Sequence, residues 1–396
     1  MWFESGVSHA AVLGRRPDLP WPATVYVEGH DQYRGWFNSS LLTAVANRGK
    51  PPYRQVITHG FTLDGQNRKM SKSLGNVISP QDVAGKLGAE ILRLWVSMVN
   101  YIEDMRLSDE ILDRNVEAYR KIRNTFRYIL GNLNDFNPAR DSLAEDQMLP
   151  LDRWALLKLD DLTREVVPAY ESYAFHTVHH ALHNFCAVTL SSLYFDILKD
   201  RLYTSVAWSR ERRSAQTALH RIGHAVCRLM APIVPFTADE IWQELPRVAG
   251  DPESVHLALF PAPAGDAASP DRAALRRERE ALLAVREQVL PALEAERRAQ
   301  TIGAALEACI TLKAEPALHA QLQAHREELP FLFIVSAVEL EPAPEGSALT
   351  VGVRRAEGSK CARCWNVLPT VGADPELAVL CARCATAVRA IRKGRP

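Results

Sequence analysis

The hydrophobic pattern near the start of the chain predicts an α/β segment. Residues 24–27 and 55–58 are short runs that favour β-strands, and residues 36–46 between them have the apolar spacing of a helix. Gly49 and Pro51 follow this helix and are expected to end it. A crossover of this length joins parallel strands in a sheet that helices cover. The pattern therefore predicts a βαβ unit of a doubly wound, Rossmann-like α/β fold.

The pattern becomes helical after residue 107. An apolar stripe at helical spacing shows this most clearly, and it consists of Tyr119, Ile122, Phe126 and Ile129. We expect residues 108–250 to form an α-helical bundle.

A change of composition marks the end of the bundle. Residues 246–270 are rich in Pro, Ala, Gly and Asp, which is typical of a linker. Beyond it the pattern predicts a charged helix over 271–300, strands over 308–312 and 331–340, and a helix between these strands. The chain is thus expected to be multidomain, with boundaries at 1–107, 108–250, 251–353 and 354–396. The third part is a small α/β element with its linker, and the fourth is a short tail that contains four of the cysteines.

Composition is that of a globular protein with several domains. The chain has 396 residues, of which 47% are hydrophobic and 24% charged, and one domain accounts for roughly 100–200 residues. Lys plus Arg and Asp plus Glu both number 47, so the net charge is zero. Residues 354–396 carry nine basic and three acidic residues, a local net charge of +6 that suits contact with phosphate. No apolar run approaches the roughly 18 residues of a membrane span, and the first residues lack a signal peptide pattern, so we expect a cytoplasmic protein.

Four of the seven cysteines form two C-x-x-C pairs, namely Cys361, Cys364, Cys381 and Cys384. This spacing fits a closed tetrahedral site for one structural Zn²⁺ ion, since four thiolates leave no open coordination position for chemistry. A disulfide framework is the alternative, but it suits oxidising compartments. Another group at helical spacing could in principle bind a metal, and it consists of His176, His179, His180, His183 and Cys186.

Polar residues follow both predicted strands, where an open parallel sheet binds its ligands. Glu28 could hold an ammonium or a ribose hydroxyl, and Gly29 lets the backbone approach a ligand closely. Lys69 and Lys72 lie in a polar loop between Gly65 and Gly75, and could swing onto phosphates. The alternatives are a solvated loop acid and a solvated turn.

These residues carry a family resemblance. Residues 69–73 read Lys-Met-Ser-Lys-Ser directly after a strand, which matches the KMSKS signature of class I aminoacyl-tRNA synthetases. Residues 28–36 and 2–6 resemble the branched-aliphatic subgroup, and most of all the isoleucyl-tRNA synthetases. The resemblance covers essentially the whole chain. It implies that residues 1–107 are the C-terminal half of a catalytic domain, and that residues 108–250 bind the tRNA anticodon.

The resemblance also implies roles for single residues. Lys72 would bind ATP, which arrives with Mg²⁺, and Lys69 would assist catalysis. The aminoacyl-adenylate would contact Glu28, Gly29, Asp31, Gln32, Trp36 and Trp2. The two tryptophans would line the amino-acid pocket because aromatic walls offer apolar contact without an unpaired polar group. Burial of these tryptophans in a core is the alternative.

The chain departs from the family pattern in two ways. Position 4 is Glu where the family usually has Asp. The HIGH motif and the large editing insertion are absent, and residues 221–224, Arg-Ile-Gly-His, imitate HIGH within a helical stretch. We therefore expect this chain alone to be inactive in amino-acid activation.

The expected partners are tRNA(Ile), isoleucine and ATP. Arg120, Arg123 and Arg127 share one helix face that could follow an RNA backbone or be merely solvated, and the zinc tail offers charge and a stacking surface to RNA. The chain is expected to be a monomer, or to join a complementary N-terminal portion. The alternatives are a stand-alone, non-catalytic tRNA-binding protein, and a fragment of a valyl- or leucyl-tRNA synthetase.

Overall fold

The computed structural model describes residues 2–265 and 269–394. The chain divides into two compact units, one of Met1–Arg120 with Ala169–His180, and one of Lys121–Pro168 with Ala181–Pro396. Each unit is considered by itself.

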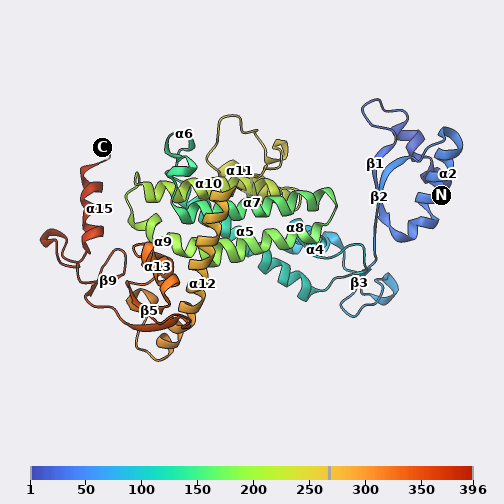
Figure 1. The fold of residues 1–396 in the computed structure, drawn as a ribbon. Coiled ribbons are helices and arrows are strands. Elements are labelled where there is room, and N and C mark those ends of the chain that lie inside the picture. The colour runs from blue at the N-terminus through green and yellow to red at the C-terminus, as the bar shows by residue number, and fades with distance from the viewer. Residues whose placement is uncertain (1, 266–268, 395–396) are drawn as a thin grey trace. The chain divides into compact units, whose positions relative to one another are not determined.

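The first unit begins with the predicted βαβ element (Figure 1). Strand β1 covers Ala23–Gly29, helix α2 covers Trp36–Arg48 and strand β2 covers Tyr53–His59. The strands are parallel, with partners from Ala23↔Tyr53 to Gly29↔His59, as predicted. Gly49 ends α2 in the left-handed conformation at φ 66°, where glycine has no steric cost. Before β1 lie helix α1, Trp2–Gly6, and a π-helical turn, His9–Leu13.

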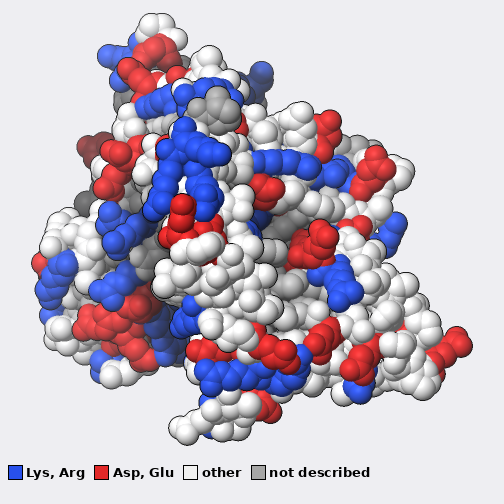
Figure 2. Space-filling model, turned by 90° about the vertical axis from the view of Figure 1, so that its left-hand side faces the viewer, with Lys and Arg blue, Asp and Glu red and all other residues white. Residues whose placement is uncertain are grey.

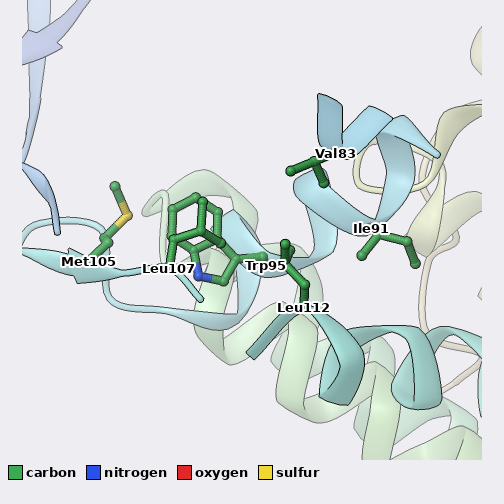
Figure 3. Packing of buried hydrophobic residues seen from close by; sticks show 6 residues of the cluster. All are labelled: Val83, Ile91, Trp95, Met105, Leu107 and Leu112. Atoms are coloured by element: carbon green, nitrogen blue, oxygen red, sulfur yellow. The ribbon is translucent and has the colours of Figure 1, made fainter. Parts of the chain in front are cut away.

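The rest of this unit surrounds a second two-stranded parallel sheet, β3 Thr62–Leu63 with β4 Met105–Arg106. Helices α3, Pro80–Leu87, and α4, Ala89–Met98, lie between these strands in sequence. Figure 3 shows the buried cluster formed here by Val83, Ile91, Trp95, Met105, Leu107 and Leu112. In the part of the chain that the structure describes, this α/β region holds two short parallel sheets rather than one extended doubly wound sheet.

The predicted helical region is confirmed. Its helices are α5 Asp109–Leu133, α6 Pro138–Asp141, α7 Pro150–Glu171, α8 Phe175–Asn184, α9 Phe195–Thr204, α10 Arg210–Met230 and α11 Pro235–Glu244, with π-helical residues Phe185–Tyr194 joining α8 to α9. The predicted stripe on α5 faces inward: Ile122, Phe126 and Ile129 are buried. The hydrophobic side of this helix therefore points into a core, as its periodicity indicates.

A buried carboxylate ties several of these helices together. Asp152 on α7 accepts hydrogen bonds from Arg201 Nη1 and Nη2 on α9, at 2.9 and 2.7 Å, and from the Tyr194 hydroxyl at 2.7 Å. The Ser214 hydroxyl on α10 donates to the same carboxylate. A buried carboxylate is tolerated inside a protein only when it is paired and hydrogen-bonded. Because its partners lie on other helical segments, this network fixes those segments relative to α7.

The described residues of the linker include the 3₁₀ turn Val255–Leu257, and helix α12, Pro270–Arg298, follows as predicted. The small α/β element consists of β5 Ala308–Ala314, α13 Pro316–Ala324, α14 Leu329–Phe333, β6 Ala337–Pro342 and β7 Thr350–Arg355. Strand β5 lies between β6, which is parallel to it, and β7, which is antiparallel. Further 3₁₀ turns are His30–Arg34, Lys72–Leu74, Glu145–Gln147, Ala305–Glu307 and Pro375–Leu377.

One strand prediction is wrong in its first half. The expected strand over 331–340 begins only at residue 337, because the preceding residues form helix α14. Leu329, Leu332 and Phe333 are all buried at helical spacing, and Ile334 ends the turn at φ 59°. A run of apolar residues cannot by itself distinguish a buried strand from a buried helical turn.

One helical segment is long and apolar enough to cross a membrane, judged by length and composition alone. The expectation that no segment approaches a membrane span is therefore wrong. This segment is Phe175–Thr204, and about half of it is buried inside the protein. Leu190, Tyr194 and Leu198 on it have no exposed surface. Core helices of soluble proteins pass the same test, and these buried residues give this segment the pattern of one.

Candidate functional site

The carboxyl ends of β1 and β2 lie side by side, as expected for parallel strands. Glu28 is paired with Thr58, and Gly29 with His59. Beyond the strands, His30 Nδ1 is hydrogen-bonded to the His59 carbonyl at 3.2 Å. The two strand ends thus form one polar edge.

The predicted ligand-binding residues of this edge differ in exposure. Glu28 and Asp31 are exposed, whereas Gly29 is buried. Gln32 stabilises the local backbone, because its Oε1 accepts a hydrogen bond from the Trp36 backbone at 3.0 Å and so caps the start of α2, while its Nε2 donates to Asp31. Glu28 and Asp31 therefore present carboxylates to solvent at the edge of the sheet, where a ligand could meet them.

The two predicted pocket tryptophans also differ in exposure and packing. Trp36 is half-buried, stacks on Tyr26 with ring centroids 4.2 Å apart, and donates from Nε1 to the Ser5 carbonyl. Trp2 keeps 50% of its surface exposed. The indole of Trp36 is thus held rigidly, while Trp2 is accessible beside Gly35.

A buried carboxylate organises the loop that carries Lys69 and Lys72. Asp64, 7% exposed, accepts from the backbone of Gln66 and Arg68 at 2.9 Å, and from the Arg68 guanidinium and Asn76 Nδ2. The hydrogen bond from Asn76 is the main reason that the pKa of Asp64 lies well below its usual range, and the Arg68 backbone adds to it. The loop is therefore folded around a permanent negative charge.

Asn76 joins the two sides of the same loop. Its Oδ1 accepts from the Ser71 backbone at 2.9 Å, and its Nδ2 donates to the Lys69 carbonyl at 3.2 Å. Between these two residues, Met70 packs against the buried cluster of Figure 3. Met70 thus anchors the loop to the core, while Lys69 and Lys72 lie at the surface.

Both lysines are exposed, and within residues 2–265 and 269–394 neither ammonium has a carboxylate partner. Lys69 Nζ lies 5.5 Å from the centroid of the Phe61 ring, and that ring meets the His30 ring edge-on at 4.6 Å. These contacts bring the lysine loop to the strand end that holds Glu28. The Lys69 ammonium thus lies over a ring that itself contacts His30, the residue that follows the end of β1.

Gly60 makes this arrangement possible because the chain passes very close to it. A Cβ atom there would lie 2.3 Å from the backbone of Glu103, and the Gly60 amide donates to the Tyr101 carbonyl at 2.9 Å. Only glycine permits such an approach. The sequence did not indicate three further residues of this site, namely Phe61, Asp64 and Asn76. Their importance depends on tertiary contacts, which no local sequence pattern predicts.

The four predicted cysteines come together in the C-terminal module. Cys361 and Cys364 flank a turn between β8, Ser359–Lys360, and β9, Val367–Leu368, while Cys381 and Cys384 lie at the start of α15, Ala382–Lys393. All four are buried, and their sulfur atoms lie within 4.8 Å of one another.

The geometry fits zinc. Bonds of about 2.3 Å in a tetrahedron place ligand sulfurs about 3.8 Å apart, and Cys364 Sγ lies 3.8 Å from Cys381 Sγ. The Cys384 thiol donates to Cys364 and lowers the pKa of the latter to about 4, so a thiolate is favoured there. None of the seven cysteines is in a disulfide. The module is therefore a structural zinc site, and the disulfide alternative is excluded.

Two other candidate motifs have ordinary explanations. Among the described residues, the only group placed to bind a metal is the four-cysteine cluster, so the histidines on α8 form no such site. The HIGH-like residues 221–224 lie inside α10, where Ile222 and Gly223 are buried. His224 is buried as well, and only Arg221 is exposed, so the motif is part of the helix core and is not a nucleotide-binding loop.

Much of the positive charge of the tail is paired. Arg354, Arg383 and Arg389 form ion pairs with Glu339, Asp200 and Asp374, respectively. Figure 2 shows basic and acidic side chains mixed over the face on which the C-terminal elements lie in Figure 1. Exposed cations without a carboxylate partner in the described part of the tail are Arg355, Lys360, Arg392 and Lys393.

A cavity of about 640 Å³ lies between α9, α14 and the zinc module. Its lining includes Tyr203, Arg363 and Trp365, and the two aromatic side chains are mostly exposed. Asn366, also in the lining, is buried with its Oδ1 lacking a hydrogen-bond partner among the described residues. Aromatic and cationic side chains thus line one open space.

On α5 the predicted basic face is present but partly neutralised. Arg120 pairs with Glu117, and Arg123 lies 3.6 Å from Glu240. Arg127 is exposed and has no ion-pair partner among the described residues.

Three family models match the chain. Residues 1–108 match "tRNA synthetases class I (I, L, M and V)", residues 152–312 match "Anticodon-binding domain of tRNA ligase", and residues 358–387 match "Zinc finger found in FPG and IleRS".

Curated relatives match nearly the whole chain. The isoleucine--tRNA ligase of Syntrophotalea carbinolica is 51% identical over 97% of this chain, and that of Geobacter sulfurreducens is 50% identical over 98%. The chain spans 42% of the length of each of these two relatives. Among solved structures, a ternary LeuRS–tRNA–LeuAMS complex of Agrobacterium radiobacter K84 is 17% identical with a TM-score of 0.49, covering 90% of this chain and 34% of that one. Methionyl-tRNA synthetase of Mycobacterium tuberculosis with methionyl-adenylate is 21% identical with the same TM-score, covering 62% and 48%.

Proposed function

We propose that this chain, which belongs to the isoleucine--tRNA ligase family and is a C-terminal portion of it, supplies one side of a site that activates isoleucine with ATP and transfers it to tRNA(Ile). The observation that carries the proposal is the loop of residues 64–76, which holds two unpaired lysines beside the polar end of a parallel sheet. Such an edge is where an open α/β sheet binds its ligand.

The lysines act on the nucleotide. Lys72 binds the ATP phosphates and Lys69 assists, because two ammonium groups without carboxylate partners are free to offset charge that develops as pyrophosphate leaves. Mg²⁺, arriving with ATP, shares this charge. The lysines are anchored by their backbone and free at their tips, which suits a clamp that closes on its substrate.

The strand end and α2 receive the aminoacyl-adenylate. Glu28 and Asp31 offer exposed carboxylates, and Gly29 allows close approach of the backbone. Gln32 acts mainly through α2, whose start it caps. Trp36 and Trp2 provide aromatic walls for the isoleucine side chain, one held by stacking and one accessible.

The parts of the chain that follow the catalytic portion face the tRNA. We assign residues 1–107 to the catalytic portion, 108–250 to anticodon binding, 251–353 to the linker with the small α/β element, and 354–396 to the zinc-binding tail. The cavity beside Trp365 and the unpaired cations of the tail have the stacking and charge that RNA requires. The protein acts in the cytoplasm, as a monomer or joined to a complementary N-terminal portion.

The test is ATP–pyrophosphate exchange with isoleucine. It compares this chain alone with the same chain complemented by the preceding portion of the Geobacter sulfurreducens relative, hereafter the complemented protein. We expect no exchange without the preceding portion and clear exchange with it. In the complemented protein, Lys72→Ala should reduce exchange about 100-fold, whereas Lys86→Ala, an exposed lysine on α3, should leave it unchanged.

Other results would favour the alternatives. Tight tRNA binding with no exchange after complementation would indicate a non-catalytic tRNA-binding protein. Faster exchange with valine or leucine than with isoleucine would move the substrate assignment to another member of the branched-aliphatic group. Exchange by this chain alone would contradict the need for the preceding portion.

A further inference from the structure

We infer that Asn76 is a positioning residue, which directs Lys69 and Lys72 toward substrate phosphates, and that Asp64 holds the Asn76 amide in its working orientation. This inference rests on the proposed role of the two lysines. It adds to that role two residues that do not touch the substrate themselves.

The Asn76 amide binds the backbone on both sides of Met70. It accepts from the Ser71 N–H at 2.9 Å and donates to the Lys69 carbonyl at 3.2 Å, as a residue of a neighbouring β-strand would. Leu63 and Lys69 form an isolated antiparallel bridge, so this stretch of loop is held from two directions. The Met70 side chain packs into the cluster of Figure 3 and supplies a third restraint. The Lys69 backbone is therefore fixed although its ammonium is exposed.

Ser71 transmits the restraint to Lys72. Its hydroxyl accepts from the Leu74 backbone at 3.3 Å and caps the 3₁₀ turn Lys72–Leu74. A Ser71 backbone held by Asn76 thus sets where this turn begins, and Lys72 is its first residue. The two lysines are directed by one amide group.

Asp64 decides which way that amide is turned. A carboxylate only accepts hydrogen bonds, so the Nδ2 group of Asn76 must face it, which it does at 2.9 Å. The Oδ1 atom is then left for the Ser71 N–H. With the amide reversed, oxygen would face the carboxylate and nitrogen would face an N–H donor, which is unfavourable at both ends. The remaining acceptor positions of Asp64 are filled by Arg68 and the loop backbone, so its own orientation is also fixed.

This arrangement predicts that asparagine is required at position 76. Alanine removes all three hydrogen bonds. Aspartate keeps the shape and the acceptor for Ser71, but it loses both donors and places a second carboxylate beside Asp64. We expect both substitutions to release the lysine loop without touching either lysine.

The first measurement is hydrogen exchange of the Ser71 amide in this chain. Asn76→Ala should accelerate it about tenfold or more, since the hydrogen bond that protects this amide is lost together with the two that hold the Asn76 side chain. Asn76→Asp is a second variant that preserves side-chain volume and should act in the same direction. Gln66→Ala is the matched control, because Gln66 lies in the same loop and only its backbone contacts Asp64.

The second measurement is a kinetic comparison in the complemented protein. Asn76→Ala should lower kcat/KM for ATP about 10- to 100-fold in ATP–pyrophosphate exchange while leaving KM for isoleucine unchanged. General destabilisation would not separate the two substrates in this way. Gln66→Ala should match the unsubstituted protein.

The outcomes separate this inference from the proposed function. If Ser71 exchange, or the ATP dependence, is the same in Asn76→Ala as in the unsubstituted protein, Asn76 does not position the lysines and the inference is overturned. Equal losses for ATP and isoleucine would also overturn it. If the unsubstituted complemented protein shows no exchange at all, the proposed function fails first, and the inference fails with it.

Discussion

Removing zinc is expected to unfold the C-terminal module while leaving the helices of the bundle folded. The perturbation is chelation of the metal, or the single substitution Cys384→Ser. Residues 359–393 contain the module, and α10, Arg210–Met230, serves as the internal reference.

The expected size of the effect follows from the composition of the module's buried core. Its buried cluster has six members, and four of them are the cysteine ligands; the other two are Leu380 and Ala385. Burial of one leucine contributes about 2 kcal/mol, whereas a structural zinc site contributes about 10–16 kcal/mol of apparent binding free energy. Four partly buried side chains also pack against this cluster, namely Leu368, Val371, Leu377 and Val388. The metal is still the largest single contribution to the module's stability, and loss of one ligand should remove several kcal/mol of it.

The assay combines zinc content with hydrogen exchange followed by mass spectrometry. The unsubstituted chain should contain one zinc ion and protect amides throughout residues 359–393, and the chelated chain should lose this protection while keeping that of α10. Cys227→Ser is the control, because Cys227 is a buried cysteine on α10 far from the cluster in sequence, and serine can still donate to the Ala238 carbonyl. Full protection of the module in metal-free protein would refute the reasoning.

Three further predictions concern the folded scaffold. Asp152→Ala should lower the free energy of unfolding in urea by about 3–5 kcal/mol, because Arg201 then becomes a buried, unpaired charge. The double variant with Arg201→Ala should recover part of this loss, and strictly additive effects would count against the pair. Burial lowers the pKa of His220 from 6.5 to about 4, so between these pH values the unfolded chain binds more protons than the folded one, and acidification should lower the free energy of unfolding by about 3 kcal/mol. Urea titrations at several pH values should show this slope, and an equal slope in His220→Gln would assign it to other groups. Gly60→Ala should lower the midpoint of thermal unfolding, since a Cβ atom would overlap the Glu103 backbone and cost about 1–3 kcal/mol; an unchanged midpoint would show that the backbone moves aside freely.

Helices and strands were predictable where the hydrophobic periodicity agrees with the glycines and prolines that end each element. The βαβ unit was predicted because β-favouring runs, a helix and a Gly-Pro stop occur in the only order that gives parallel strands. Residues 331–333 were mistaken for strand because a short apolar run fits both structures. Strand β7 was not predicted, since Thr350–Arg355 contains a central glycine and ends in two arginines. It pairs with the edge of β5 that β6 leaves open.

Charge was harder to predict than secondary structure. A net charge of +6 in the tail suggested a basic surface. The structure pairs Arg383 with Asp200, which lies 183 residues earlier in the chain. No count of charges within a segment can reveal a partner that distant.

The sequence by itself determined the chemistry that is available: two lysines in a KMSKS loop, carboxylates after a strand, and four cysteines at the spacing of a zinc site. Each depends on residue types at short separations, where the backbone path is nearly set. Only the tertiary structure decided that the Asn76 amide turns toward Asp64, that Lys69 lies over Phe61 beside His30, and that Gly60 passes against Glu103. Such contacts join residues that the chain brings together only after it folds, because hydrogen bonds and ring contacts act over a few ångströms in space whatever the separation in sequence.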